Sequence, residues 1–191
     1  MGLSLQVGVP RHVLQGDAAR DVAAAIRDRL GYAMPWTLRL LPWSHRDEIA
    51  VSWVEELQSF AAKLGSFPHL AACDGWSTVY LPTEVIVPTV VEWGTSDGRT
   101  RVEGYGPGAD LLRAAVEARN EPAEASALTF VCASLPRLGT ELQALSAAAA
   151  LSIRDAAALA ASDDPVRSCF GHFVLATSVA LKRHQPLWVV K

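Results

Sequence analysis

Apolar residues recur three and four positions apart in several stretches of this chain, and such spacing predicts amphipathic helices. The pattern covers Asp17 to Leu30 and Ser44 to Leu64, and each stretch is followed by a glycine, a residue that commonly ends helices. In the second stretch the predicted buried stripe is Ile49, Trp53, Leu57, Phe60 and Leu64. Asp47 and Glu48 would lie in its first turn, where acidic side chains suit the helix dipole.

Helices are also predicted along the later part of the chain. One covers Ala109 to Arg119, and a long one covers Thr140 to Ala161, where Thr140 and Gln143 have the spacing of a capping box. The pair Asp164-Pro165 then predicts the start of a helix that runs to about His184, because an acidic cap followed by proline favours a helix N-terminus.

Strands are predicted where β-branched and aromatic residues form short runs. These runs are Ser4 to Val9, Trp36 to Leu41, Trp76 to Leu81 and Leu187 to Val190. The segment 121–135 fits either state, because its alanines favour helix whereas its run Leu-Thr-Phe-Val-Cys favours strand.

A hairpin is predicted in the middle of the chain, with strands from Glu84 to Trp93 and from Arg99 to Tyr105 around a Thr-Ser-Asp-Gly turn. Its register has two solutions. A two-residue turn would place Glu92 opposite Glu103, which is repulsive, whereas a four-residue loop would place Glu92 opposite Arg101, which is attractive. The longer loop is favoured on that ground.

Together these elements predict a single α+β domain over residues 1–191. We expect a mostly antiparallel sheet with a central hairpin, packed against several helices on one side, and a helical C-terminal half.

Composition narrows the classes of function. The net charge is −3 and the densest basic spot is only Lys182-Arg183-His184, so DNA or RNA binding is not expected. The sequence shows neither a secretory signal nor a long apolar stretch, which predicts a soluble, cytoplasmic protein without membrane contact. The three cysteines, Cys73, Cys132 and Cys169, are widely spaced among apolar neighbours, and this favours buried thiols over a metal site.

The chemical motifs of the common enzyme classes are not found in the sequence, and no cofactor is predicted. A glycine-rich loop at 104–108 precedes a predicted helix, but it lacks a lysine partner and is interpreted as a turn. An enzyme with a dispersed site is still an alternative. Its candidates are His172 as a base with Glu84 or Asp74 as its carboxylate, in a pocket between the sheet and the last helix. The competing interpretation places His172 on the flank of a helix without a chemical role.

A protein-binding surface is predicted at the hairpin. Six tryptophans are many for 191 residues, and Trp93 lies beside a charged turn. An exposed tryptophan near arginine has the composition of an interface hot spot. The predicted partner-binding residues are Trp93, Asp97, Arg99 and Arg101.

The order of segments resembles that of small bacterial immunity proteins encoded beside polymorphic toxins. The resemblance rests on Val79-Tyr80-Leu81-Pro82-Thr83-Glu84 before the hairpin, the helix at Gly108 to Val116, Ala176-Thr177-Ser178, and the closing run Gln185 to Val190. It covers about half of the chain and includes no diagnostic motif. The resemblance implies a non-catalytic inhibitor that neutralises a cognate toxin by direct contact, with no cofactor. The alternatives are the dispersed-site enzyme and an assembly or scaffold subunit.

Overall fold

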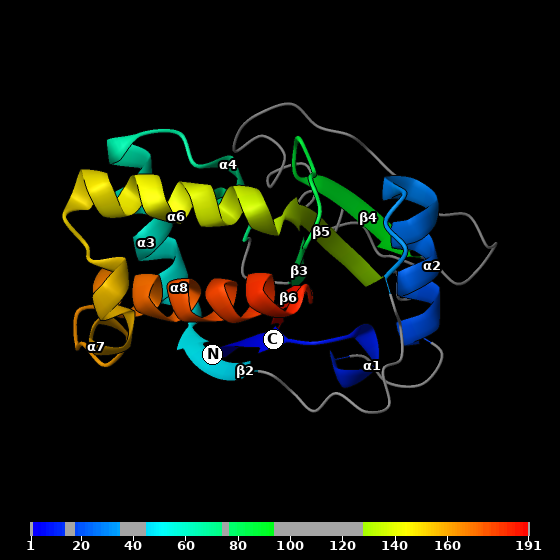
Figure 1. Cartoon of the computed structure of the whole chain (residues 1–191), viewed down its shortest axis with the longest axis horizontal. Coiled ribbons are helices and arrows are strands. Elements are labelled where there is room, and N and C mark those ends of the chain that lie inside the picture. The colour runs from blue at the N-terminus through cyan, green and yellow to red at the C-terminus, as the bar shows by residue number, and fades with distance from the viewer. Residues whose placement is uncertain (1, 14–17, 35–44, 74–76, 94–127, 191) are drawn as a thin grey trace, which may run out of the picture.

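The computed structural model of this chain describes residues 2–13, 18–34, 45–73, 77–93 and 128–190. Within them, strands form one six-stranded sheet in the order β2-β1-β6-β3-β5-β4 (Figure 1). The strands are β1 (Gly2–Val7), β2 (His45–Ala50), β3 (Ser77–Leu81), β4 (Thr89–Trp93), β5 (Leu128–Ser134) and β6 (Leu187–Val190).

Most neighbouring strands run antiparallel, as the sequence predicts. The antiparallel pairs are β1 with β2, β1 with β6, β3 with β6 and β4 with β5, whereas β3 and β5 are parallel. Ser4 of β1 pairs with Val190 of β6, so the first and last strands lie side by side in the sheet.

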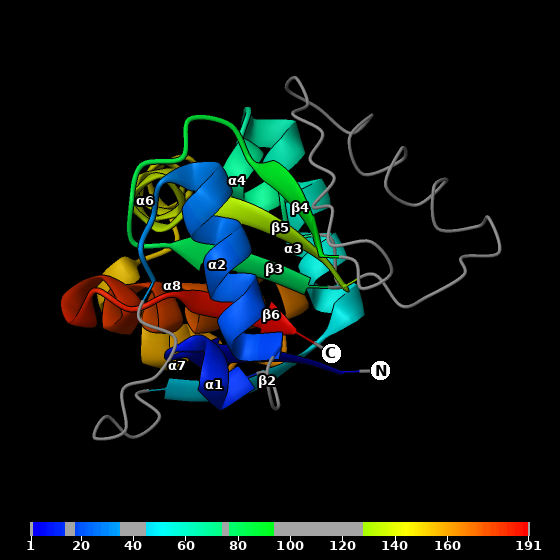
Figure 2. The same ribbon diagram turned by 90° about the vertical axis from the view of Figure 1, so that its right-hand side faces the viewer.

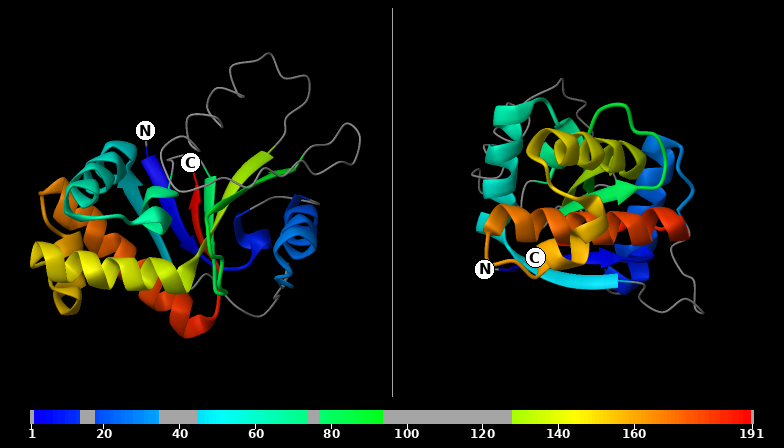
Figure 3. Two further views of the ribbon diagram at one scale, coloured as in Figure 1. Left: turned by 90° about the horizontal axis from the view of Figure 1, so that it is seen from above. Right: turned by 60° about the vertical axis from the view of Figure 1, so that its left-hand side comes forward.

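Helices cover both faces of this sheet, which corrects the expectation of one-sided cover. On one face lie α3 (Val51–Leu64), α6 (Leu135–Ala149), α7 (Ala156–Ala160) and α8 (Pro165–Arg183), and α2 (Ala18–Leu30) lies across the other (Figures 2 and 3). The short segments are α1 (Pro10–Val13), α4 (Pro68–Ala71) and the 3₁₀ turn η1 (Ile153–Asp155). The α+β class and the helical C-terminal half are confirmed.

The physical reason for the second layer is the apolar character of the central strands on both faces. Val79, Leu81 and Trp188 turn away from the larger helical layer and pack with Val22 and Ile26 of α2. Their neighbours Tyr80 and Leu187 turn the other way, into the larger core with α3, α6 and α8. Strands that are apolar at successive positions must be covered on both faces.

The largest sequence-based error concerns the segment that begins at His45. A helix was predicted from Ser44, but residues 45–50 form strand β2 and helix α3 begins at Val51. Along β2, Arg46 and Glu48 are exposed and Ile49 is buried, which is the alternation of a strand with one covered face. Ile49 fits both patterns, and only pairing with β1 decides between them.

The stripe predicted for this helix is partly correct. In α3 the buried residues are Val54, Leu57 and Ala61, and Trp53 and Phe60 pack against the core as partly buried side chains. Leu64, predicted to be buried, is exposed.

The predicted long helix Thr140 to Ala161 is also corrected. Helix α6 begins at Leu135, where the Ser134 hydroxyl accepts a hydrogen bond from the Arg137 N–H and Pro136 occupies the first turn. The helix ends at Ala149, and Ala150 adopts a left-handed conformation with φ of 54°. A run of alanines carries no local stop signal, so the sequence pattern does not reveal this end.

Ala150 provides a stability test of the helix end. Alanine in the left-handed region is strained by roughly 1 kcal/mol and glycine is not, so Ala150→Gly is expected to raise the free energy of unfolding by up to about 1 kcal/mol, as measured by urea denaturation. The matched control Ala149→Gly lies within the helix and is expected to lower it by about 1 kcal/mol. If both variants lose stability, Ala150 is not strained.

The first hairpin strand, predicted from Glu84 to Trp93, is shorter than expected, because β4 covers only Thr89–Trp93 and residues 84–88 form a loop. Most of the other element predictions are confirmed where the structure describes them. Helices α2 and α8 and strands β3 and β6 lie within a residue or two of their predicted bounds, and β1 begins and ends two residues before its predicted range. Asp164 caps α8 by accepting a hydrogen bond from the Arg167 N–H at 2.8 Å. The ambiguous segment 121–135 contains strand β5. The predicted strand 36–41, second hairpin strand 99–105 and helix 109–119 lie outside the described residues, so the hairpin register stays a prediction.

Among the described helices, none has the length and apolar character needed to cross a membrane.

Candidate functional site

The predicted partner-binding residues fall at the boundary of the described structure. Trp93 is the last residue of β4, and its backbone is paired with Leu128 of β5. Asp97, Arg99 and Arg101 lie outside the described residues, as does Asp74 of the alternative enzyme site. β4 is an edge strand of the sheet formed by the described residues.

Glu84 and His172, proposed together for an enzyme site, have different partners. The Glu84 carboxylate accepts a hydrogen bond from Arg137 Nε at 2.7 Å, whereas His172 contacts Asp47 of β2. Glu84 follows β3, which is separated from β2 by two strands of the sheet. The predicted pairing of His172 with Glu84 is therefore wrong.

Glu84 belongs to a loop, residues 82–88, that joins β3 to β4 and is anchored at several points. The Thr83 carbonyl accepts a hydrogen bond from the Ser134 hydroxyl at 3.0 Å, and the Val87 carbonyl accepts one from the Thr89 hydroxyl at 3.0 Å. The Val85 side chain is buried. The Ser134 hydrogen bond and the Glu84–Arg137 ion pair hold the 82–88 loop against the start of α6.

The tip of this anchored loop is apolar. Ile86 is 76% exposed and the adjacent Val87 is 38% exposed. Leu64, at 42%, is the other large apolar residue exposed in the described part of the chain, and it lies on α3. Ile86 thus leaves most of its apolar surface in water although the loop that carries it is fixed.

His69 lies beneath the loop, at the start of α4, and is buried. Its Nδ1 accepts a hydrogen bond from the Ser134 N–H at 3.1 Å, so the proton of the neutral ring is on Nε2. Burial, reinforced by the Arg137 charge, lowers the pKa of His69, and the Ile86 backbone and the Glu84 charge offset this only in part. The imidazole is therefore kept neutral, with its Nε2 lacking an aligned hydrogen-bond partner among the described residues.

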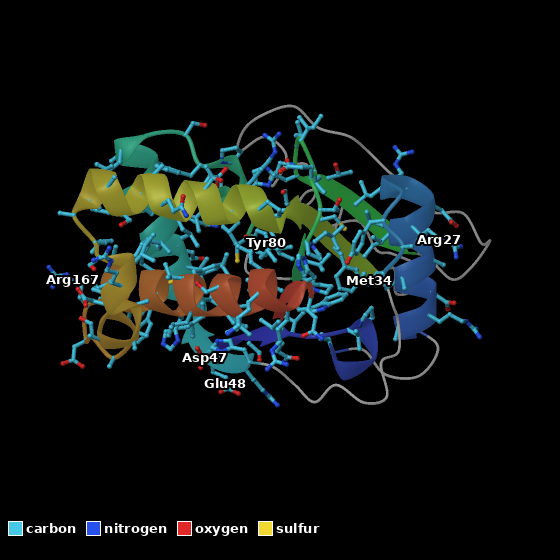
Figure 4. All side chains as sticks on the ribbon, viewed as in Figure 1. Arg27, Met34, Asp47, Glu48, Tyr80 and Arg167 are labelled. Carbon is cyan, nitrogen blue, oxygen red and sulfur yellow. The ribbon has the colours of Figure 1, made fainter. Side chains whose placement is uncertain are left out.

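Two side chains fix the backbone around His69. The Glu141 carboxylate accepts hydrogen bonds from the N–H groups of His69 and Leu70 at 3.0 and 2.8 Å. The Tyr80 hydroxyl, in the interior between the sheet and the helices (Figure 4), donates to the His69 carbonyl at 3.0 Å. Burial raises the pKa of Glu141, although these hydrogen bonds and Arg137 oppose the shift. The support under the 82–88 loop thus combines residues from α4, β3 and α6.

The lowered pKa of His69 predicts a dependence of stability on pH. As the pH falls below about 6.5, the unfolded state takes up a proton that the folded state still excludes, so the free energy of unfolding falls. We expect a smaller fall between pH 7.5 and 5.5 in His69→Gln than in the wild type, measured by urea denaturation. The raised pKa of Glu141 acts in the opposite sense but is common to both proteins, so it cancels in the comparison. Equal pH dependence in the two proteins would show that His69 titrates normally.

A second group of polar side chains lies at the other edge of the sheet, on strand β2. Asp47 Oδ2 is 2.9 Å from His172 Nδ1 of α8 and 2.9 Å from His45 Nε2 of β2. The side chains of His45, Asp47 and His172 are 18%, 27% and 19% exposed, so the cluster is half-buried at the sheet edge. The sequence pattern singles out His172 but predicts Asp47 in the first turn of a helix. The contact between the two residues depends on residues 45–50 pairing with β1 as a strand.

The other predicted chemical groups are structural where they are described. All three cysteines are free and buried, as predicted, and burial raises the pKa of the Cys132 thiol to about 12 and that of Cys169 well above its usual range. Within the described ranges, no three His, Cys, Asp or Glu side chains are arranged so that they could hold a metal ion.

Comparison with known proteins adds no relative: no family model, curated protein or solved structure matches this chain.

Proposed function

We propose that this protein binds a partner protein, and that the partner is a toxin which it neutralises by direct contact without catalysis. The observation that carries the binding proposal is the exposed Ile86 on the anchored 82–88 loop. The resemblance to immunity proteins supports the choice of a toxin as the partner.

The free energy available at this loop is substantial. Full burial of an isoleucine side chain is worth about 1.5–3 kcal/mol, and Ile86 leaves about three quarters of that surface exposed. Because the loop is already held by Ser134, Thr89 and Arg137, little conformational entropy is lost when a partner covers it. Arg137, which pairs with Glu84 of this loop, is of a residue type that is enriched at interface hot spots.

The charged pair beside the tip supports specificity. The Glu84 and Arg137 side chains are 62% and 44% exposed, so both groups are accessible at the rim of an apolar contact. Rim charges mainly affect association rates and partner choice. Trp93, the last residue of β4, is about 15 Å along the strand from the loop.

Ile86→Asp is expected to weaken partner binding by about 30-fold or more, the effect of losing a hot-spot residue. The partner is captured with tagged full-length protein from the native host, identified by mass spectrometry, purified, and titrated by calorimetry. Leu64→Asp is the matched control, because Leu64 is also an exposed apolar residue but lies on α3; its affinity is expected to stay within about threefold of the wild type. Equal affinity of Ile86→Asp and wild type would exclude the 82–88 loop as the contact.

The toxin assignment has a separate test. The captured partner, expressed alone, is expected to arrest growth of a test host, and co-expression of this chain is expected to restore growth, whereas co-expression of the Ile86→Asp variant is not. If a tight partner is captured and proves harmless, the immunity assignment is wrong and the binding proposal stands.

A further inference from the structure

The cluster of His45, Asp47 and His172 brings together groups that are 125 residues apart in the chain. Strand β2 supplies His45 and Asp47 on one face, because alternate residues of a strand point the same way. The register of β2 on β1, with Leu5 opposite Asp47, sets this face toward α8, and Asp47 lies beside that helix in Figure 4. Arg46 and Glu48 point to the opposite face and form an exposed ion pair at 3.6 Å.

The contact between His172 and Asp47 fixes which ring nitrogen is basic. An ionised carboxylate only accepts hydrogen bonds, so Nδ1 of His172 carries the proton that it donates to Asp47 Oδ2 at 2.9 Å. The lone pair of the neutral ring is then on Nε2, pointing away from the aspartate. A carboxylate that holds an imidazole in this tautomer is what a general base requires.

His45 plays a different part in the cluster. Its Nε2 lies 2.9 Å from the same Asp47 oxygen, but the two groups are not aligned as a hydrogen bond and this nitrogen is buried. His45 is therefore in close contact with Asp47, whereas His172 makes the aligned bond.

The backbone that carries His172 is fixed by its neighbours. Phe170 and Phe173 are fully buried, and Gly171 lies so close to α7 that an added Cβ would be 2.3 Å from the Ala160 nitrogen. A side chain mounted on such a packed helix keeps its position relative to the strand opposite. The His172 side chain is 19% exposed, so part of it is in contact with solvent.

We propose that His172 is a general base, positioned by Asp47, for attack of an O–H nucleophile on the carbonyl carbon of a small ester. In the step, His172 Nε2 takes the proton of a water molecule while the water oxygen bonds to the carbonyl carbon. The bond from that carbon to the leaving oxygen then breaks, and the alcohol departs with the proton returned by the imidazolium. In this reaction His172 is the catalytic residue and Asp47 a positioning residue. The inference is independent of the proposed partner binding, because the cluster lies on β2 and α8 and the 82–88 loop follows β3.

The test uses the full-length protein and p-nitrophenyl acetate as the probe ester. Release of p-nitrophenolate is expected to be about 10²-fold slower with His172→Gln than with the wild type, the lower end of general-base contributions. Asp47→Asn is expected to slow the release of p-nitrophenolate by a similar factor, and His45→Gln by a smaller one. The controls His184→Gln, at the exposed C-cap of α8, and Glu48→Gln, on the other face of β2, are expected to match the wild type.

A nitrogen NMR spectrum of the histidines separates a positioning role from a purely structural one. Neutral His172 is expected to carry its proton on Nδ1 in the wild type and to lose this preference in Asp47→Asn, while both proteins give native circular dichroism. The proposal would be overturned if His172→Gln released p-nitrophenolate at the wild-type rate. It would also be overturned if neutral His172 carried its proton on Nε2 in the wild type. Either result leaves the Ile86 binding test unaffected.

Discussion

Trp188→Ala is expected to lower the free energy of unfolding by about 4 kcal/mol, within the range for truncation of a buried aromatic residue. Trp188 is fully buried on β6, and its indole N–H donates to the Gly8 carbonyl at 2.9 Å. Its ring meets Phe130 of β5 edge to face, with centroids 6.1 Å apart. The substitution therefore leaves a cavity between the sheet and α2 and removes the donor to a buried carbonyl.

Two further variants make the measurement specific. Trp188→Phe retains an aromatic ring but loses the N–H donor, and we expect a loss of about 2 kcal/mol. Leu64→Ala, at an exposed position, is expected to change stability by less than about 0.5 kcal/mol. The free energies come from urea denaturation. A loss below about 1 kcal/mol for Trp188→Ala would mean that α2 does not close the second core.

Gly171→Ala is expected to lower the free energy of unfolding by about 3 kcal/mol, at the upper end of overpacking effects. An alanine Cβ would be 2.3 Å from the Ala160 nitrogen and 2.6 Å from the Ala156 oxygen. Both atoms belong to the backbone of α7, so the contact is relieved only if α7 and α8 move apart. This crossing of helices requires a residue without a side chain.

The matched control is Gly139→Ala, in the interior of α6. A Cβ there would meet the end of the Leu181 side chain at 3.3 Å, a group that can shift. Alanine is favoured over glycine within helices by about 1 kcal/mol, so this variant is expected to be as stable as the wild type or up to about 1 kcal/mol more stable. Thermal denaturation of Gly171→Ala and Gly139→Ala measures the change in stability of each variant. Equal changes in the two variants would contradict the close contact of α7 and α8.

The elements predicted correctly are those with local start and stop signals. Helix α8 has Asp164 as its cap and Pro165 at its first position, and α2 ends where Gly31 adopts a φ of 66°. These signals act within a few residues, so the sequence pattern contains them. The same reasoning missed the end of α6, because Ala150 is left-handed without being the glycine that usually marks such an end.

The candidate sites were predicted only in part. His172 was named as a candidate base from the sequence, but the carboxylate that it contacts is Asp47 and not the predicted Glu84, and Asp74 lies outside the described residues. Glu84 was predicted to begin a strand, but it lies in the 82–88 loop, and its contact with Arg137 arises from the packing of this loop on α6. Exposure of Ile86 had no signal in the sequence, because its neighbours are as apolar as those of a buried strand.

The sequence by itself determined the α+β class, the positions of α2, α8, β3 and β6, and the burial of the three cysteines. These follow from periodicity and from caps, which are interactions between near neighbours in the chain. The tertiary structure alone decided that residues 45–50 form a strand, that α2 covers a second face, and that Asp47 meets His172. Each of these depends on a partner far along the chain, and free energy gained from such contacts overrides local preference.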